Sequence, residues 1–325
     1  MSASPALLEV DGLSVKVGDI TLVDRVSLAI APGEIFGLVG ESGSGKTLTA
    51  LAIMRLLPPT LRIEGAIRLE GRDLLGLSER EMRRVRGGRT GMVFQEPVAA
   101  LNPVFSIGQQ LVAAIRAHQP LSRRAARARA VELLELVGIP SGARRLDFYP
   151  HALSGGQCQR AMIAMALAGG ARLLIADEPT TSLDVTIQDE IVRLIERLAR
   201  ETGIAVLFIS HDLGLVARLC HVVGVAYGGQ IVETGDARDL LRGPAHPYTQ
   251  GLVRCVPDLA DIGVLHRGIP GYPPAAGAWP SGCRFRARCP EAAPGCEQPQ
   301  GLSALRPERQ VRCWRALHAA VLADA

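Results

Sequence analysis

The stretch Leu153-Ser154-Gly155-Gly156-Gln157 decides the fold of this chain, because two other motifs flank it in an informative order. Upstream, Gly40-Glu41-Ser42-Gly43-Ser44-Gly45-Lys46-Thr47 fits the phosphate-loop pattern G-x-x-x-x-G-K-S/T without a gap. Downstream, the apolar run Leu173-Leu174-Ile175-Ala176 ends in Asp177-Glu178, which predicts a buried strand with two carboxylates at its end. A phosphate loop alone indicates a nucleotide site, and the acidic strand end adds groups suited to Mg²⁺ and an attacking water.

The residues around the upstream motif supply the context that a phosphate loop needs. Residues 34–39 are largely apolar and predict a buried strand, and residues 46–57 predict a helix that Pro58-Pro59 stops. Strand, loop and helix in this order place backbone N–H groups and the positive helix end around the phosphates. Lys16 and Lys46 are the only lysines in a chain that otherwise uses arginine, and a compact ammonium suits the space between β- and γ-phosphate oxygens.

The three motifs together resemble those of the ATP-binding cassette (ABC) ATPases, whose signature is LSGGQ. The resemblance implies an α/β fold, the P-loop NTPase nucleotide-binding domain with a mixed sheet core and a helical subdomain. We expect this domain over residues 1–245, with the helical subdomain at about 98–155, and a small C-terminal cysteine-containing extension over residues 246–325. In such ATPases two cassettes sandwich two ATP molecules head to tail, so this chain would need a second cassette, identical or homologous.

The nucleotide-binding residues come from the phosphate loop and from the signature. The loop glycines let the backbone approach the phosphates, Lys46 neutralises them, and Thr47 offers a hydroxyl to Mg²⁺. The signature opens a helix whose N–H groups, by the resemblance, face the γ-phosphate held by the opposite cassette. The full expected set is Gly40, Ser42, Gly43, Ser44, Gly45, Lys46, Thr47, Ser154, Gly156 and Gln157.

The acidic strand end is assigned to the hydrolytic chemistry. Asp177 is suited to hold Mg²⁺ through water, together with Thr47. Glu178, beside it, is suited to orient or deprotonate the attacking water. A solvated strand end is the ordinary explanation of an Asp-Glu pair, but its place after a phosphate loop and the signature favours the catalytic interpretation.

Three further positions match ABC motifs by residue. Gln95, in Phe94-Gln95-Glu96-Pro97, resembles the glutamine that senses Mg²⁺ and couples the cassette to the transporter. Asp184, in Ser182-Leu183-Asp184, resembles the aspartate at the dimer interface. His211, in His211-Asp212-Leu213, resembles the switch histidine that hydrogen-bonds the γ-phosphate.

Several segments resemble one branch of this family, the oligopeptide/dipeptide importers. They are Leu101-Asn102-Pro103, Tyr149-Pro150-His151, His246-Pro247-Tyr248-Thr249 and Ile269-Pro270-Gly271-Tyr272-Pro273-Pro274, and the run from Asp177 to Gln188 is close to the first of the two ATPase subunits. The resemblance implies a transport-coupled ATPase that uses ATP and Mg²⁺ to import di- or oligopeptides. Nickel and oligosaccharide importers use similar cassettes, so another solute stays open.

The implied partners are a second ABC ATPase subunit, two transmembrane permease subunits and, indirectly, an extracytoplasmic solute-binding protein. The chain would then work as a peripheral protein at the cytoplasmic face of the inner membrane. A soluble ABC ATPase of DNA repair or translation is the alternative from a different class. Such proteins usually carry two cassettes, large coiled-coil inserts or zinc modules within the cassette, whereas this chain has one cassette and no long heptad array.

Composition agrees with a globular protein, and if the protein works at a membrane it does so through partners. The 325 residues are 48% hydrophobic and 21% charged. No apolar run reaches the roughly 18 residues that indicate a membrane-spanning helix. The N-terminus lacks the basic and apolar regions of a secretory signal, and we expect none. A net charge of +4 is too small and too dispersed to predict nucleic-acid binding.

Four cysteines are spaced as Cys283-x₅-Cys289-x₆-Cys296-x₁₆-Cys313, which is neither a zinc-ribbon nor a ferredoxin pattern. Structural disulfides are not expected in a reducing cytosol. Between residues 281 and 315 seven arginines stand against three glutamates, a basic setting that would offset an anionic cluster. Some peptide-importer ATPases carry such a cluster, so we favour a 4Fe–4S centre, with zinc and no metal as alternatives.

The residue at position 17 departs from the family pattern. Relatives commonly place an aromatic side chain near this position, where it stacks on adenine. This chain has Val17 there, and no Tyr, Trp or Phe precedes Phe36. Stacking of a side chain at this position on adenine is therefore in doubt.

Overall fold

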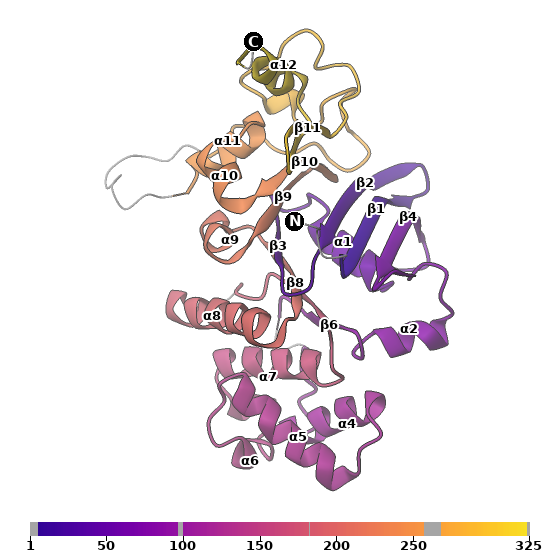
Figure 1. Ribbon diagram of the computed structural model, residues 1–325, viewed down its shortest axis with the longest axis vertical. Helices are drawn as coiled ribbons and strands as arrows, with labels where there is room; N and C mark the ends of the chain where they lie inside the picture. Colours follow the sequence, from indigo (N-terminus) through magenta and orange to yellow (C-terminus); the bar gives the residue numbers. More distant parts are fainter. Residues whose placement is uncertain (1–5, 97–99, 182, 257–267, 324–325) are drawn as a thin grey trace. The chain divides into compact units, whose positions relative to one another are not determined.

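The computed structural model describes residues 6–96, 100–181, 183–256 and 268–323. The chain forms two compact units (Figure 1). Unit 1 comprises Met1–Leu8, Ile30–Ile35 and Arg68–Ile209, and unit 2 comprises Glu9–Ala29, Phe36–Ile67 and Ser210–Ala325. Each unit therefore combines segments that are far apart in the sequence.

Unit 1 is built on a parallel sheet in the order β8-β7-β6. Its strands are β6 Thr90–Val93, β7 Leu173–Asp177 and β8 Ala205–Ser210. Leu173 of the central strand is in register with Thr90 on one side and Ala205 on the other. Every residue of these strands is buried, as continuous apolar runs require in a parallel sheet covered on both faces.

Several helices of unit 1 begin at capping side chains. Ser106, Ser122 and Ser154 each accept a hydrogen bond from the backbone N–H three residues later, so α4, α5 and α7 start there and pack on one another. The described elements are α2 Glu79–Val85, α4 Ile107–His118, α5 Arg123–Leu136, α6 Gly142–Arg145, η1 Pro150–Ala152, α7 Gly155–Leu167, α8 Val185–Thr202 and the short strand β5 Arg72–Asp73. The predicted start of the helical subdomain, near residue 98, lies outside the described residues.

Unit 2 contains two sheets, one in the order β2-β1-β4 and one in the order β11-β12-β10-β9-β3. In the second, β3 runs parallel to β9 while β9, β10, β12 and β11 are antiparallel neighbours, which is the predicted mixed sheet. The strands are β1 Leu8–Val17, β2 Ile20–Ile30, β3 Ile35–Val39, β4 Leu61–Leu69, β9 Val222–Tyr227, β10 Gln230–Asp236, β11 Ser303–Arg306 and β12 Arg309–Val311.

The helices of unit 2 are α1 Lys46–Ile53, α9 Leu213–Leu219, α10 Ala237–Arg242, α11 Pro247–Arg254, η2 Arg286–Arg288 and α12 Trp314–Ala323. Helix α1 ends at Ile53, before the predicted end at residue 57. Arg55 has a φ of 50°, in the left-handed region that a continuing helix cannot use. A backbone turn, not Pro58, therefore ends the helix.

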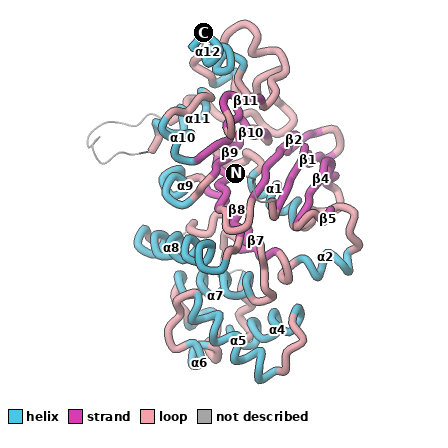
Figure 2. Tube along the Cα trace, viewed as in Figure 1, coloured by secondary structure: helices cyan, strands magenta, loops and turns pink. Residues whose placement is uncertain are grey.

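Residues 268–302 of the C-terminal extension are mostly loop (Figure 2), and aromatic side chains anchor them to the rest of unit 2. Phe285 is 2% exposed and meets Tyr227 and Tyr248 edge-on, at ring-centroid distances of 5.2 and 5.3 Å. Such pairs add about 0.5–1.5 kcal/mol each to the gain from burial. The extension thus shares a core with the sheet instead of forming its own.

A buried carboxylate joins the extension to β10. Glu233 is 0% exposed and accepts hydrogen bonds from the backbone N–H groups of Ala245 and His246, both at 2.9 Å. Arg309, on β12, donates to it at 2.6 Å and also to the carbonyl oxygen of Gly243. A charge buried this deeply is tolerated because it is both paired and hydrogen-bonded.

We therefore expect Arg309→Ala to destabilise the protein by about 3 kcal/mol, because it leaves Glu233 without its cation. The measurement is the urea midpoint of unfolding, followed by circular dichroism. Arg306→Ala is the matched control, since that arginine lies on the neighbouring strand and is exposed. Equal midpoints for the two variants would contradict this role of the ion pair.

No helix in the described part of the chain is long and apolar enough to cross a membrane.

Candidate functional site: a phosphate loop, an acidic strand end and a cysteine cavity

The phosphate loop of unit 2 links β3 to α1. Lys46 is 5% exposed, and its Nζ donates to the carbonyl oxygens of Gly40 at 2.8 Å and Glu41 at 3.0 Å. The backbone N–H of Glu41 donates to Tyr248 Oη at 2.9 Å, a contact that the sequence did not predict. The ammonium therefore lies within the loop that is expected to receive the phosphates.

Backbone conformation requires glycine at several positions of this loop. A Cβ on Gly40 would lie 2.1 Å from the carbonyl oxygen of Ala226, so no side chain fits there. Gly43 has a φ of 77° and nothing within 4 Å of the place of a Cβ, which leaves open space at the tip of the loop. Ser44 is 5% exposed, and its hydroxyl has no hydrogen-bond partner among the described residues. Such an orphaned hydroxyl suits a site that receives a polar ligand.

The acidic strand end lies in unit 1. Asp177 closes β7 and is 5% exposed, while Glu178 follows it with a φ of 47°. This left-handed conformation is uncommon outside glycine and is frequent at functional sites. Glu178 Oε2 accepts hydrogen bonds from Gln95 Nε2 at 3.3 Å and from Thr181 Oγ1 at 3.0 Å. The structure thus brings together the two predicted residues Gln95 and Glu178, and adds Thr181, to which the sequence analysis gave no role.

The signature begins α7, also in unit 1. Ser154 Oγ accepts from the backbone N–H of Gln157, whose side chain in turn accepts from the N–H of Ser154, a reciprocal cap. Gly156 packs against α8, where a Cβ would come within 2.8 Å of Ile187 Cγ2. Gln159 Nε2 donates to the carbonyl oxygen of Pro179 at 2.6 Å. The signature helix is therefore tied to the segment that follows Glu178.

Two predicted residues are exposed at element ends. Asp184 caps α8, and its Oδ1 accepts from the backbone N–H of Ile187 at 3.0 Å. Ser182, in the same motif, lies outside the described residues. His211 follows β8 and is exposed, and Asp212 after it caps α9. The role of Asp184 at a dimer interface stays a prediction, and so does the role of His211 at the γ-phosphate.

The four cysteines of the extension line one cavity of unit 2, together with His246, Glu291, Trp314 and the arginines 286, 312 and 315. Burial raises the pKa of the Cys283 and Cys313 thiols, and raises that of Cys289 to about 11. Among the described residues, no three His, Cys, Asp or Glu side chains are placed to hold a single metal ion.

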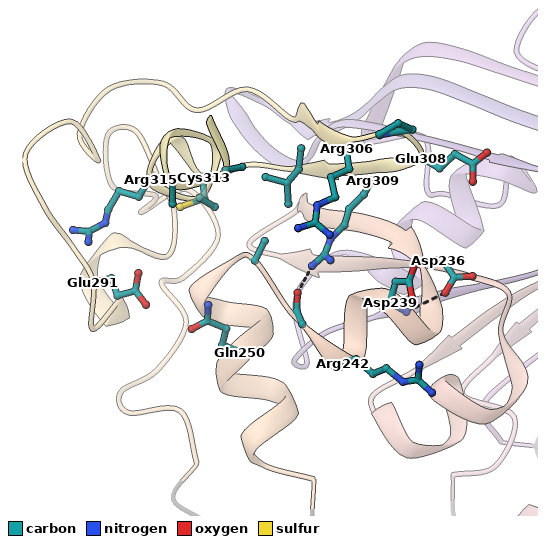
Figure 3. Close-up of a pocket in the computed structure, with 17 residues that line it drawn as sticks. Asp236, Asp239, Arg242, Gln250, Glu291, Arg306, Glu308, Arg309, Cys313 and Arg315 are labelled. Atoms are coloured by element: carbon teal, nitrogen blue, oxygen red, sulfur yellow. Dashed lines mark hydrogen bonds between the residues drawn. The ribbon is translucent and has the colours of Figure 1, made fainter. Parts of the chain in front are cut away.

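A second cavity adjoins the first and has a volume of about 640 Å³. It opens between α10, the β11–β12 hairpin and α12 (Figure 3), and shares Glu291, Cys313 and Arg315 with the cysteine cavity. Its walls carry aspartates and glutamates as well as arginines, so its charge favours neither anions nor cations. Cys313 therefore lines both cavities.

Comparison with known proteins places this architecture in a family. The ABC transporter family model matches residues 23–181, and the model of the oligopeptide/dipeptide transporter C-terminal region matches residues 232–296. The dipeptide transport ATP-binding protein DppD of Escherichia coli (strain K12) is 46% identical over 315 residues, which are 95% of this chain and 96% of that protein. The chain belongs to the ATP-binding subunits of the oligopeptide/dipeptide ABC transporter family.

Other relatives agree with this assignment. A peptide import ATP-binding protein of Brucella abortus (strain 2308) is 48% identical to this ABC ATPase over 312 residues, 94% of each chain. Among solved structures, a dimeric ATP-binding cassette in a post-hydrolysis state bound to ADP and Pi superposes with a TM-score of 0.62 at 27% identity, covering 71% of this chain and 99% of that one. A component of the cbiONQ transporter of Clostridium perfringens gives a TM-score of 0.65 at 26% identity, covering 73% and 91%. The predicted fold class, an α/β P-loop NTPase cassette with a mixed sheet and helices, is confirmed.

Proposed function

We propose that this ABC ATPase is the motor subunit of an importer of di- or oligopeptides. The observation that carries the proposal is the second family match, because the cassette alone is common to transporters of many solutes while residues 232–296 match a region named for oligopeptide and dipeptide transport. The dipeptide and peptide import proteins that resemble it over nearly their whole length support the same solute class. A nickel or oligosaccharide importer is the second candidate.

In this proposal the chain contributes half of each of two ATP sites. Residues 40–47 hold the phosphates, with Thr47, Asp177 and Gln95 around Mg²⁺, Glu178 as the base and His211 at the γ-phosphate. Ser154, Gly156 and Gln157 face the nucleotide of a second cassette, and Asp184 lies at the interface between the two. The cassette corresponds to residues 1–245, and residues 246–325 are the extension.

The partners follow from the same proposal. A second ATPase subunit completes the dimer, and two transmembrane permeases carry the solute that an extracytoplasmic binding protein delivers. The dimer of the ADP-bound cassette supports the first of these partners. The subunit would then be peripheral, on the cytoplasmic face of the inner membrane.

Uptake in the native host tests the solute class. Deletion of the coding sequence should abolish uptake of radiolabelled di- and tripeptides, and expression of the intact chain should restore it while Glu178→Gln should not. Uptake of nickel and of oligosaccharides, measured in the same strains, serves as the control. If the deletion strain loses nickel or oligosaccharide uptake and keeps peptide uptake, the transported solute is not a peptide.

We further propose that Cys283, Cys289, Cys296 and Cys313 hold a 4Fe–4S cluster. The support is that four cysteines, the usual ligands of such clusters, line one cavity together with three arginines. A zinc site on the same four cysteines is the alternative. The cavity has only about 10 Å³ of free space, so a cluster would spread its walls.

The cluster would act as a structural centre of the extension, whose loops have little core of their own. Protein purified without oxygen should be brown, with broad absorption at about 400 nm and bound iron and sulfide. Replacing any one of the four cysteines by Ser should remove the colour and make the extension protease-sensitive. Cys220→Ser and Cys255→Ser are the matched controls. Colourless, iron-free protein with a protease-resistant extension would refute the cluster. Zinc bound in a one-to-one ratio would show a zinc site in its place.

A further inference from the structure

Residues 268–279 form an extended segment of unit 2, here called the strap. One end is held at the β1–β2 hairpin. Trp279 Nε1 donates to the carbonyl oxygen of Thr21 at 3.0 Å, and a Cβ on Gly277 would contact Ile20 at 3.2 Å. Arg284 lies over the Trp279 ring, 4.8 Å from its centre, and covers one face of it.

The other end of the strap is held to the phosphate loop through one arginine. Arg288 pairs with Glu41 through two hydrogen bonds, at 2.6 and 3.0 Å. The same guanidinium donates to the carbonyl oxygens of Pro270 at 2.9 Å and Ile269 at 3.3 Å. The Arg288 side chain is only 5% exposed, and a bidentate pair so shielded from solvent is strong and directional. Arg288 therefore positions the strap relative to the second residue of the phosphate loop.

A cavity of about 370 Å³ lies between the strap and the phosphate loop. Residues 41–44 form one wall and residues 272–276 the other, with Tyr227, Gly228 and Trp279 completing it. Its volume falls in the usual range of small-molecule sites, about 300–1,000 Å³. The buried hydroxyl of Ser44, which has no partner within the described residues, belongs to the same wall.

One of the aromatic residues around this cavity presents a free ring. Tyr227 is 1% exposed and packs in the aromatic core, and Trp279 has one face covered by Arg284. Tyr272 is 93% exposed, although it stands in a segment fastened at both ends. An exposed aromatic ring beside a phosphate loop suits stacking on a flat ligand.

We infer that the strap forms the base-side wall of the nucleotide site, with Tyr272 stacking on the purine of the nucleotide whose phosphates lie in residues 40–47. The C-terminal extension then supplies the aromatic surface that the hairpin at Val17 lacks. This inference rests on the proposed role of the phosphate loop. It makes Tyr272 a binding residue for the base and Arg288 a positioning residue that acts through the strap.

Two probes separate the base from the phosphates: ATP and inorganic tripolyphosphate, each measured by equilibrium calorimetry on the full chain. Tyr272→Ala should weaken ATP binding at least about 5-fold, since base–aromatic stacking contributes that much to binding. It should leave tripolyphosphate binding unchanged, because no base is present. Tyr272→Phe keeps the ring and should bind ATP as the unmodified protein does. Tyr149→Ala, which removes an exposed tyrosine of unit 1, is the matched control.

The outcomes are distinguishable. Unchanged ATP affinity in Tyr272→Ala, or an equal loss for both probes, would overturn the role of the strap while the phosphate loop stands. An unmodified protein that binds neither probe would overturn the phosphate loop itself, and this inference with it. Trp279 gives a second readout in a Trp314→Phe background, where ATP should change its fluorescence and tripolyphosphate should not.

Discussion

Glu178→Gln lowers the rate of ATP hydrolysis by about 100-fold or more and leaves ATP binding intact; this is the expected result if Glu178 is the general base. The amide has nearly the same shape as the carboxylate but cannot take a proton from water. Its oxygen can still accept the hydrogen bond from Thr181 Oγ1, which spans 3.0 Å in the unmodified protein. The backbone at φ 47° also needs no change, since both side chains branch beyond Cβ in the same way.

Hydrolysis and nucleotide affinity should be measured separately, by phosphate release and by equilibrium binding. ATP-dependent association of two cassettes should become long-lived, because the step that separates them is blocked. Glu196→Gln, at an exposed position of α8, is the matched control and should hydrolyse ATP normally. A Glu178→Gln protein with the full rate would show that another group activates the water.

Lys46→Ala should weaken ATP binding by a factor on the order of 100 or more. The substitution removes the ammonium beside the β- and γ-phosphates, and each hydrogen bond to a charged group is worth about 1.5–3 kcal/mol. It also removes the two hydrogen bonds to the carbonyl oxygens of Gly40 and Glu41 that hold the loop. Tripolyphosphate binding should fall with ATP binding, in contrast to the effect of Tyr272→Ala.

The chain offers a close control in its other lysine. Lys16 forms an ion pair with Glu64 at 2.7 Å, and both side chains are partly exposed. Lys16→Ala should leave affinity for both probes unchanged, because an exposed pair of this kind contributes little. Unchanged affinity in Lys46→Ala would contradict the phosphate-loop assignment.

The local motifs were predictable because short-range geometry determines them. A strand, a glycine-rich turn and a helix that begins at Lys46 follow from contiguous residues, and so does the cap formed by Ser154 and Gln157. The apolar run before Asp177 predicted a buried strand, and β7 is one. The end of α1 was predicted too late, because the left-handed turn lies at Arg55 and not at a Gly or Asn, the residue types that usually indicate such a turn.

Other features depend on contacts between residues that are far apart in the chain. The sequence by itself determined the phosphate loop, the signature helix, the acidic strand end and the cysteine spacing, since each depends on residues that are close together in the chain. Only the tertiary structure placed Arg288 on Glu41, Gln95 on Glu178 and Tyr272 beside the tip of the phosphate loop. Such contacts arise when distant segments bury a common core, as Phe285 does against Tyr227, and no local periodicity encodes which segments will meet.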